Sequence, residues 1–196
     1  MAWDTEKTKR LLLDAAVEEF AEHGFQGARV DRVAKSAGVN KERIYQYFGN
    51  KEQLFATVLD SELKKLAGAV PLTPEAAADL PEHVGQIYDY HLAHPHFSRL
   101  VHWEGLELGG DRTVPAEHER TVHYLAKVES IAAAQRAGAI DAALDPKVLM
   151  LVVVHLAQMW SSLPQVAKML LGGSAEDTPE ARRAAVVALT AKIVAP

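Results

Sequence analysis

The apolar positions of this 196-residue chain recur mainly at intervals of three and four residues, which is the period of an amphipathic helix. In the segment from about Asp4 to His23, Leu12, Ala16 and Phe20 fall on one stripe, and Gly24 is placed to end the helix. No stretch has the sustained alternation of apolar and polar residues that is typical of a strand. The pattern therefore predicts an all-α fold.

Six further helices are predicted after residue 49. They are a helix beginning at Asn50, the segments Glu82 to His94, Pro95 to Leu108 and Pro115 to Ala137, a helix opened by Asp145 and Pro146, and a last helix opened by Thr178 and Pro179. The helix that follows Pro146 contains the run Val148 to Trp160, which is apolar on nearly all sides. We therefore expect that helix to be buried on both sides.

The segment from Val30 to Lys51 combines two short helical patterns with a turn between them. The first pattern places Val33 and Ala34 on one apolar face. Gly38 follows it, and glycine reaches the left-handed backbone region at little steric cost, so the second helix can leave at a steep angle. Asn40 can cap that second helix, which is expected from about Lys41 to Tyr47. This arrangement predicts a helix-turn-helix that binds DNA.

The second helix of this motif has one face for the core and another for a ligand. Ile44 and Phe48 are four residues apart and are expected to face the core. The other side chains of this helix remain for contacts with phosphates or base edges. They are Lys41, Glu42, Arg43, Tyr45, Gln46 and Tyr47.

The distribution of charge agrees with local binding of DNA although the chain has a formal net charge of −5. The window from Arg29 to Lys51 contains six basic and two acidic residues, whereas residues 52–196 have an excess of acidic residues. Positive charge is therefore concentrated at the predicted docking face.

The run GFQGARVDRVAKSAGVNKERIYQYFGNKEQLF, Gly24 to Phe55, resembles the DNA-binding domain of TetR-family transcriptional regulators. The resemblance combines the Ala-Gly-Val turn, the aromatic residues Tyr45, Tyr47 and Phe48, and the start Lys51-Glu52 of the next helix. It implies a three-helix DNA-binding domain at residues 1–50 and a helical ligand-binding and dimerisation domain at residues 51–196.

The resemblance also implies DNA-contact residues. Lys41, Arg43, Tyr45, Gln46 and Tyr47 would face the major groove, and Lys51 would hold a phosphate. Arg43 is the candidate for guanine and Gln46 for adenine. Arg29 stands where the family usually has a capping Ser or Thr, so that cap must come from elsewhere, and Arg29 itself could contact phosphate. Glu42 would be repelled by phosphate unless it pairs with Lys41 or Arg43 or accepts from a cytosine amino group.

TetR relatives usually enclose an apolar ligand cavity in the second domain and form dimers through the last two helices. The expected cavity residues are Tyr88, His91, Phe97, Leu100, Trp103, Glu104, Tyr124, Val128, His155, Met159 and Trp160. The last helix also has a surface of small residues, Ala181, Ala184, Ala185, Ala188 and Ala191, which suits close approach of another helix. The implied partners are an inverted-repeat operator, a small-molecule effector and a second copy of the chain.

Other features limit the alternatives. The chain has no cysteine, no recognisable signal segment and no apolar run long enough to span a bilayer, so we expect a cytoplasmic protein without a membrane partner. His91, His94 and His96 leave open a metal-dependent helical enzyme, although Pro95 interrupts the helix between them and no His-Glu-x-x-His motif occurs. A helical small-molecule-binding protein also remains possible. We interpret the chain as a transcriptional repressor released from a palindromic operator by an apolar ligand, with no catalytic residue, metal or cofactor.

Overall fold

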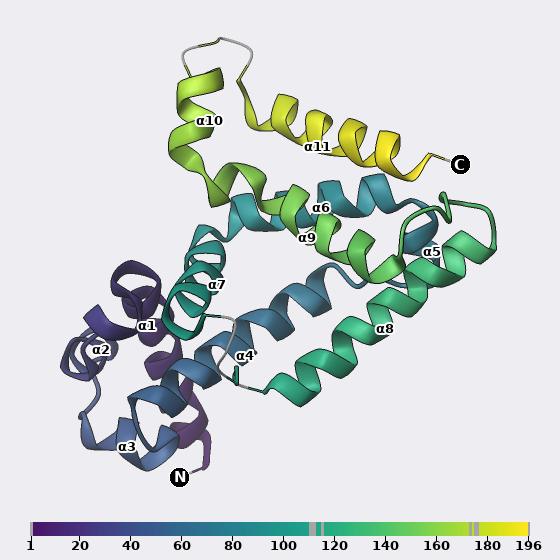
Figure 1. Cartoon of the computed structure of the whole chain (residues 1–196). Helices are drawn as coiled ribbons and strands as arrows, with labels where there is room; N and C mark the ends of the chain where they lie inside the picture. Colours follow the sequence, from purple (N-terminus) through teal and green to yellow (C-terminus); the bar gives the residue numbers. More distant parts are fainter. Residues whose placement is uncertain (1, 110–112, 115, 173, 175–176, 196) are drawn as a thin grey trace. The chain divides into compact units, whose positions relative to one another are not determined.

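The computed structural model describes residues 2–109, 113–114, 116–172, 174 and 177–195 (Figure 1). Throughout these described ranges the secondary structure is helical, and no strand occurs. The predicted all-α fold is confirmed.

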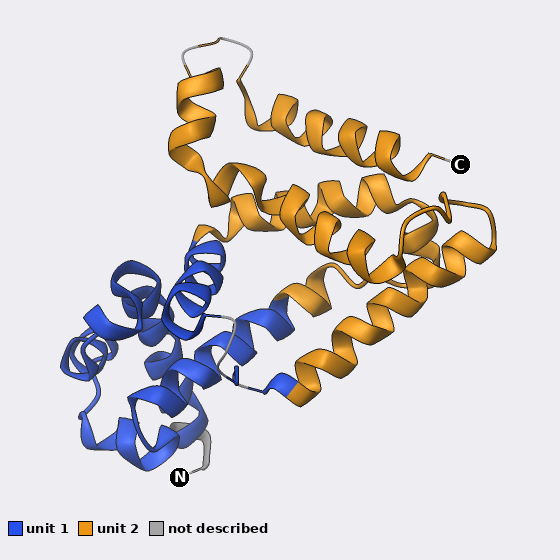
Figure 2. Cartoon of the chain, viewed as in Figure 1, with its two compact units in different colours: residues 1–65, 96–117 blue, residues 66–95, 118–196 orange. Residues whose placement is uncertain are grey.

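The chain divides into two compact units (Figure 2). Unit 1 comprises residues 1–65 and 96–117, and unit 2 comprises residues 66–95 and 118–196. Helix α4, Lys51–Ala69, begins in unit 1 and ends in unit 2.

Unit 1 contains the N-terminal helices and one helix from the middle of the chain. These are α1 Ala2–Gly27, α2 Val30–Ala37, α3 Glu42–Phe48, the first part of α4, and α7 Pro95–Leu108. The predicted stripe of Leu12, Ala16 and Phe20 is buried, with at most 1% exposure, and packs against Ile44 of α3 and Leu54 of α4. Because α1 packs against each shorter helix through one apolar face, it supports the helix-turn-helix.

The first regular helix ends at Gly24, as predicted. The φ of 65° at Gly24 is non-helical, and a short helical segment follows this kink as far as Gly27, so α1 consists of two helices joined at Gly24. A Cβ at Gly24 would lie 2.7 Å from the indole ring of Trp103. That indole donates its Nε1 hydrogen to the carbonyl oxygen of Ala21 at 3.2 Å, and Arg99 donates to the same oxygen at 2.6 Å. The break therefore gives α7 a docking place on α1.

Unit 2 contains the remaining helices. These are α5 Pro74–Ala78, α6 Leu80–Ala93, α8 Glu117–Arg136, α9 Pro146–Ser162, α10 Pro164–Leu171 and α11 Pro179–Val194. The predicted N-caps are confirmed, since Asp145 accepts from the Lys147 amide at 2.7 Å and Thr178 accepts from the Ala181 amide at 3.2 Å. The sequence did not predict α5 or α10, and the expected helix start at Pro115 lies outside the described residues.

Helix α9 corrects one expectation about burial. Leu149 and Val153 are in the core of unit 2, but Val148 is 50% exposed and Leu151 is 62% exposed. Within the single chain α9 is therefore only partly buried, although α6 and α11 pack against it. No single helix in the described ranges is long and apolar enough to cross a membrane, although α9 and α10 together, bent by 72°, meet the length and composition of a span.

His83 is a buried polar residue in α6. Its side chain is 3% exposed, and its Nδ1 atom has no hydrogen-bond partner in the described part of the chain. Burial, with a smaller contribution from the positive charge of Lys127, lowers the pKa of His83 from its ordinary value of 6.5 to about 4. His83 is therefore neutral at pH 7.

We expect His83 to make the fold sensitive to acid. Between pH 6.5 and pH 4 the unfolded chain binds a proton at this residue and the folded chain does not, so stability falls as the pH falls. At pH 5 the free energy of unfolding should be about 2 kcal/mol lower because of His83 than it is at neutral pH. Urea unfolding of the wild type and of His83→Gln at pH 7.5 and pH 5 measures this loss, which should be smaller in the variant than in the wild type. Equal losses in the two proteins would contradict the assignment.

Candidate DNA-binding interface

The turn between α2 and α3 has the geometry that its sequence predicts. Gly38 has φ 64° and ψ 29°, which is the left-handed conformation. The amide of Gly38 donates to the carbonyl oxygen of Lys35 at 3.2 Å, and the amide of Val39 donates to that of Ala34 at 3.0 Å. Asn40 accepts from the amide of Glu42 at 2.9 Å and so caps α3, as predicted.

Helix α3 is held through its apolar face. Ile44 is completely buried in the core of unit 1, and Phe48 is partly buried against the same core. Opposite to this anchor, Arg43, Tyr45 and Gln46 are exposed, and Tyr45 is 47% exposed. The structure therefore presents these three predicted DNA-contact residues to solvent from one rigid helix.

The polar side chains of this exposed face interact before any DNA is bound. Arg43 donates from Nη1 to Oε1 of Gln46 at 2.8 Å. Lys41 pairs with Asp31 of α2 at 2.9 Å, and its pKa is raised, first by the hydrogen bond to Asp31. Arg43 and Gln46 are thus oriented together, whereas Lys41 must exchange a carboxylate for any phosphate.

The two unusual residues of the motif also have defined positions. Glu42 is exposed and pairs with neither basic neighbour, because Lys41 binds Asp31 and Arg43 donates to Gln46. Arg29 precedes α2 in an extended conformation, with an exposed side chain and no side-chain cap. The pairing that could shield Glu42 from phosphate is therefore not formed in this structure.

The support that Arg29 cannot give to α2 comes from Glu19 of α1. Its carboxylate accepts from the Arg29 amide at 2.7 Å and from Nε of Arg32 at 2.9 Å. Burial alone would raise the pKa of Glu19, but the hydrogen bonds from Arg32 and from the Arg29 amide lower it below its ordinary value. Glu19 is therefore ionised and ties α2 to α1. Sequence reasoning missed it, because the ten-residue separation carries no recognisable signal.

The remaining predicted contacts lie where α3 meets α1 and α4. Lys51 opens α4 with its Nζ 4.8 Å from the ring centroid of Phe25, and Lys9 of α1 lies 5.8 Å from that of Tyr47. Asn50 and Gln53 cap the start of α4 reciprocally, each accepting from the backbone amide of the other at 3.1 Å or less. Lys51 is therefore presented at a fixed helix N-terminus.

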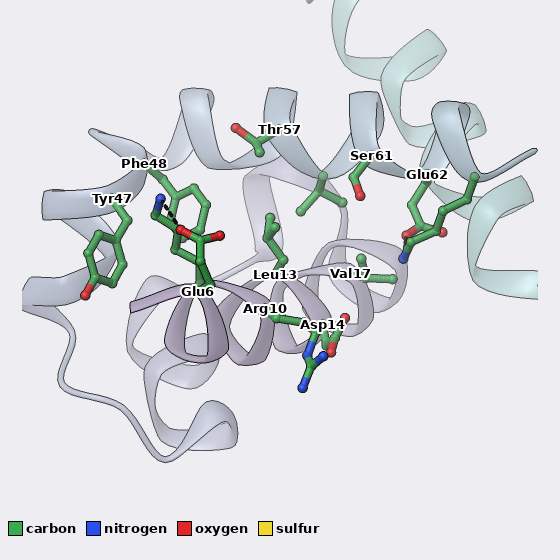
Figure 3. Close-up of a pocket in the computed structure, with 13 residues that line it drawn as sticks. Glu6, Arg10, Leu13, Asp14, Val17, Tyr47, Phe48, Thr57, Ser61 and Glu62 are labelled. Atoms are coloured by element: carbon green, nitrogen blue, oxygen red, sulfur yellow. Dashed lines mark hydrogen bonds and ion pairs between the residues drawn. The ribbon is translucent and has the colours of Figure 1, made fainter. Parts of the chain in front are cut away.

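Unit 1 also contains a groove of about 500 Å³ along α1 and α4, with Tyr47 and Phe48 at one end (Figure 3). Its charged lining residues are Glu6, Lys9, Arg10, Asp14, Glu62 and Lys65. Glu6 pairs with Lys9 at 3.0 Å, and Glu62 pairs with Lys65 at 2.6 Å. The mixed and paired charges distinguish this groove from the apolar effector cavity that the sequence predicts.

The predicted cavity residues are divided between the two units. Phe97, Leu100, Trp103 and Glu104 belong to unit 1, and the other seven belong to unit 2. Leu100 is completely buried in the core of unit 1, and Trp103 packs on Gly24. Phe97 and Glu104 are also buried.

Within unit 2 the structure brings some of the predicted residues together. The rings of Tyr88 and Trp160 meet edge to face with centroids 6.1 Å apart, and Val128 packs against the same core. His91 is buried. Tyr124, His155 and Met159 are exposed in the single chain. A cavity of about 240 Å³ adjoins Trp160, with Leu171, Ala181 and Arg182 among its walls.

The histidines considered for metal binding have separate neighbours. The Nδ1 atom of His94 is 2.9 Å from the carbonyl oxygen of Tyr90, and its ring stacks on the Tyr90 ring at 4.1 Å. The Nε2 atom of His96 is 2.9 Å from Glu62 in unit 1, whereas His91 and His94 are in unit 2. Among the residues that the structure describes, no group of three potential metal ligands is gathered.

Comparisons with known proteins agree with this geometry. Residues 12–58 match the model of bacterial regulatory proteins of the tetR family, and residues 79–192 match the tetracyclin repressor-like C-terminal domain. The chain belongs to the TetR family. It is therefore a DNA-binding transcriptional regulator with a helix-turn-helix, in a family whose members bind operator DNA and small-molecule effectors and act as dimers.

Individual relatives extend the match over most of the chain. The HTH-type transcriptional repressor SCO4008 of Streptomyces coelicolor is 42% identical over 172 residues, which is 88% of each chain. The repressor NicS of Pseudomonas putida is 35% identical over 55% of this chain and 53% of its own length. The crystal structure of the putative regulator SCO4942 of S. coelicolor is 36% identical, has a TM-score of 0.84, and matches 96% of this chain and 98% of that one.

We expect Glu19 to be required for the stability of unit 1. Glu19→Gln removes the charge that holds Arg32 and weakens the acceptor for the Arg29 amide, so the free energy of unfolding should fall by about 1–3 kcal/mol. Urea unfolding measures the change. Glu18→Gln, at the adjacent exposed position, is the matched control and should change stability by less than about 0.5 kcal/mol. Equal stabilities of the two variants would show that Glu19 does not hold α2.

Proposed function

We propose that this TetR-family chain is a repressor that binds an inverted-repeat operator as a homodimer and is released by a small-molecule effector. The observation that carries the proposal is the exposed pair Arg43 and Gln46 on a helix whose opposite face is anchored by Ile44. A rigid helix with a guanidinium and an amide on its outer face suits the reading of base edges in the major groove. The relatives SCO4008 and NicS are both named as repressors, which supports the same role here.

The exposed residues divide into those that read bases and those that hold the backbone. Arg43 is assigned to guanine and Gln46 to adenine, because their donor and acceptor groups match those base edges. Phosphate contacts are assigned to Arg29, Tyr45, Tyr47 and Lys51. Lys41 joins the interface after leaving Asp31, and Glu42 accepts from a cytosine amino group.

The dimer is proposed to form through α9 and α11. Val148, Leu151 and Met159 of α9 are exposed although they are apolar, and Ala184 and Ala188 of α11 are exposed small residues. Exposure of apolar surface to water is unfavourable, and an exposed apolar surface of this kind is typical of a protein–protein interface. A two-fold axis through it would place two recognition helices on one operator.

The assignment of domains follows from these roles. Residues 1–50 carry the DNA contacts, and residues 51–196 carry effector binding and dimerisation. The proposed effector is largely apolar, and its contacts are drawn from the predicted residues in α6 to α9, with Tyr88 and Trp160 already in contact. It releases the operator only if it binds the DNA-incompetent arrangement better than the competent one.

We expect Arg43 and Lys51 to contribute differently to DNA binding. Arg43→Ala should cost about 1–3 kcal/mol and relax preference at one base pair in each half-site, whereas Lys51→Ala should weaken all duplexes alike. Selection of DNA from a random pool, followed by titration at several salt concentrations, separates the two effects. The wild-type affinity should fall with a slope of about −0.9 in log salt for each neutralised phosphate. A flat dependence on salt, or identical loss of discrimination in both variants, would contradict these roles.

We expect a charge in the α9 surface to break the dimer. Leu151→Lys places an ammonium in an apolar contact, so sedimentation equilibrium should give a monomer at concentrations where the wild type is a dimer. Leu106→Lys is the control, because Leu106 is also exposed, at 76%, but lies on α7 in unit 1. Dimerisation of the Leu151 variant with wild-type affinity would move the interface away from α9.

A further inference from the structure

Lys127 of α8 is a half-buried cation without an anionic partner in the described part of unit 2. Its ammonium lies 5.6 Å from the ring centroid of Tyr124, three residues earlier on the same helix. Two half-buried arginines of this unit, Arg182 and Arg183, are placed differently: Arg182 pairs with Asp177, and Arg183 pairs with Glu82 and Asp89. Lys127 differs from these two by having an aromatic neighbour where they have carboxylates.

Two histidines lie within electrostatic reach of Lys127. The charge of Lys127 acts on His83 of α6, and His123 lies four residues before Lys127 on α8, which places His123 and Lys127 on one face of that helix. The pKa values of all three groups are lowered, first by burial, and the charge of Lys127 contributes for both histidines. The cluster thus combines one cation with two neutral imidazoles, and no carboxylate of the described residues pairs with any of the three groups.

The clearest indication of a binding site is at His83. This residue is 3% exposed, yet its buried Nδ1 atom has no hydrogen-bond partner among the residues that the structure describes. A buried polar atom without a partner costs free energy unless a bound molecule completes it. A neutral imidazole with its proton on Nδ1 donates one hydrogen bond, which matches one oxygen of an oxyanion.

Apolar residues border one side of the cluster, whereas His123 and Tyr124 are exposed. Ile87, one turn after His83, and Val128, beside Lys127, both pack against the core of unit 2. An ion pair formed beside such side chains is stronger than one formed in water, because few water molecules screen it. An anion with an apolar body would satisfy Lys127 and His83 and bury its body against Val128 and Tyr124.

We propose that Lys127, His83 and His123 form an oxyanion site in unit 2 and that the effector is an organic acid whose carboxylate pairs with Lys127. This inference rests on the proposed function, because it specifies the chemical class of the effector. Lys127 supplies the charge, His83 supplies a directed hydrogen bond, and His123 lines the site from the preceding turn of α8. The unliganded protein carries an uncompensated cation that the effector neutralises.

The test compares acids with their neutral amides. The probes are benzoate and benzamide, 1-naphthoate and 1-naphthamide, indole-3-acetate and its amide, and octanoate and octanamide, each measured by the shift in Tm of the full chain. At least one acid should raise the Tm while its amide does not, because only the acid carries the charge that Lys127 lacks. Amides that stabilise as well as their acids, or no shift with any acid, would overturn the proposal.

Lys127→Met keeps an unbranched side chain of nearly the same length and removes its charge. The variant should bind the stabilising acid at least about tenfold more weakly, and its Tm without ligand should be equal to or above that of the wild type, because an unpaired cation has been removed. Lys168→Met, an exposed lysine on α10 of the same unit, is the control and should bind the acid as the wild type does. Undiminished binding by the Lys127 variant would overturn the proposal.

Operator binding separates this inference from the proposed function. Without probe, the wild type and Lys127→Met should bind a selected palindrome equally, and the acid should release only the wild type. Release by neutral compounds alone would overturn the proposal that the effector is an organic acid, but would leave the proposed repressor function intact. A wild-type protein that binds no palindrome would overturn the proposed repressor function, whatever the effect of the acids on the Tm.

Discussion

The DNA-binding unit depends on the burial of Ile44. Helix α3 has only seven residues, which is too short for a helix to be stable in water by itself. Its position is fixed because Ile44 is completely enclosed by the core that α1 and α4 supply. Every polar residue on the outer face is thus oriented by an apolar residue on the inner face, and Gly38 and Asn40 set only the angle and the start of the helix.

Unit 2 differs in that its surface and interior leave groups unsatisfied. Apolar side chains of α9 are open to solvent, and the buried Nδ1 atom of His83 has no partner in the described residues. Both are costs that a single unliganded chain bears. A second copy of the chain offsets the first cost and a bound anion offsets the second. The same unit therefore has physical reasons to bind two kinds of partner, which is what coupling between an effector and a dimeric arrangement requires.

Local sequence signals predicted the helices well where capping chemistry is explicit. Asp145 before Pro146 and Thr178 before Pro179 mark helix starts that the structure confirms. They failed where an element is short or lacks a side-chain cap, as for α10, which follows α9 after a bend at Leu163. For the DNA-binding face, the buried and exposed positions of α3 follow from its period, but Glu19 and Asp31 were missed because their partners are distant along the chain.

The sequence by itself determined the all-helical fold, the turn at Gly38, the anchor at Ile44 and the family, because each depends on residues close together along the chain. The tertiary structure decided which carboxylate supports α2, which carboxylate Lys41 binds, that Trp103 packs on Gly24, and that Lys127 lies within reach of His83. These interactions join residues that are from ten to about eighty positions apart. No periodicity or capping rule connects such residues, since their proximity is set only by how the helices pack.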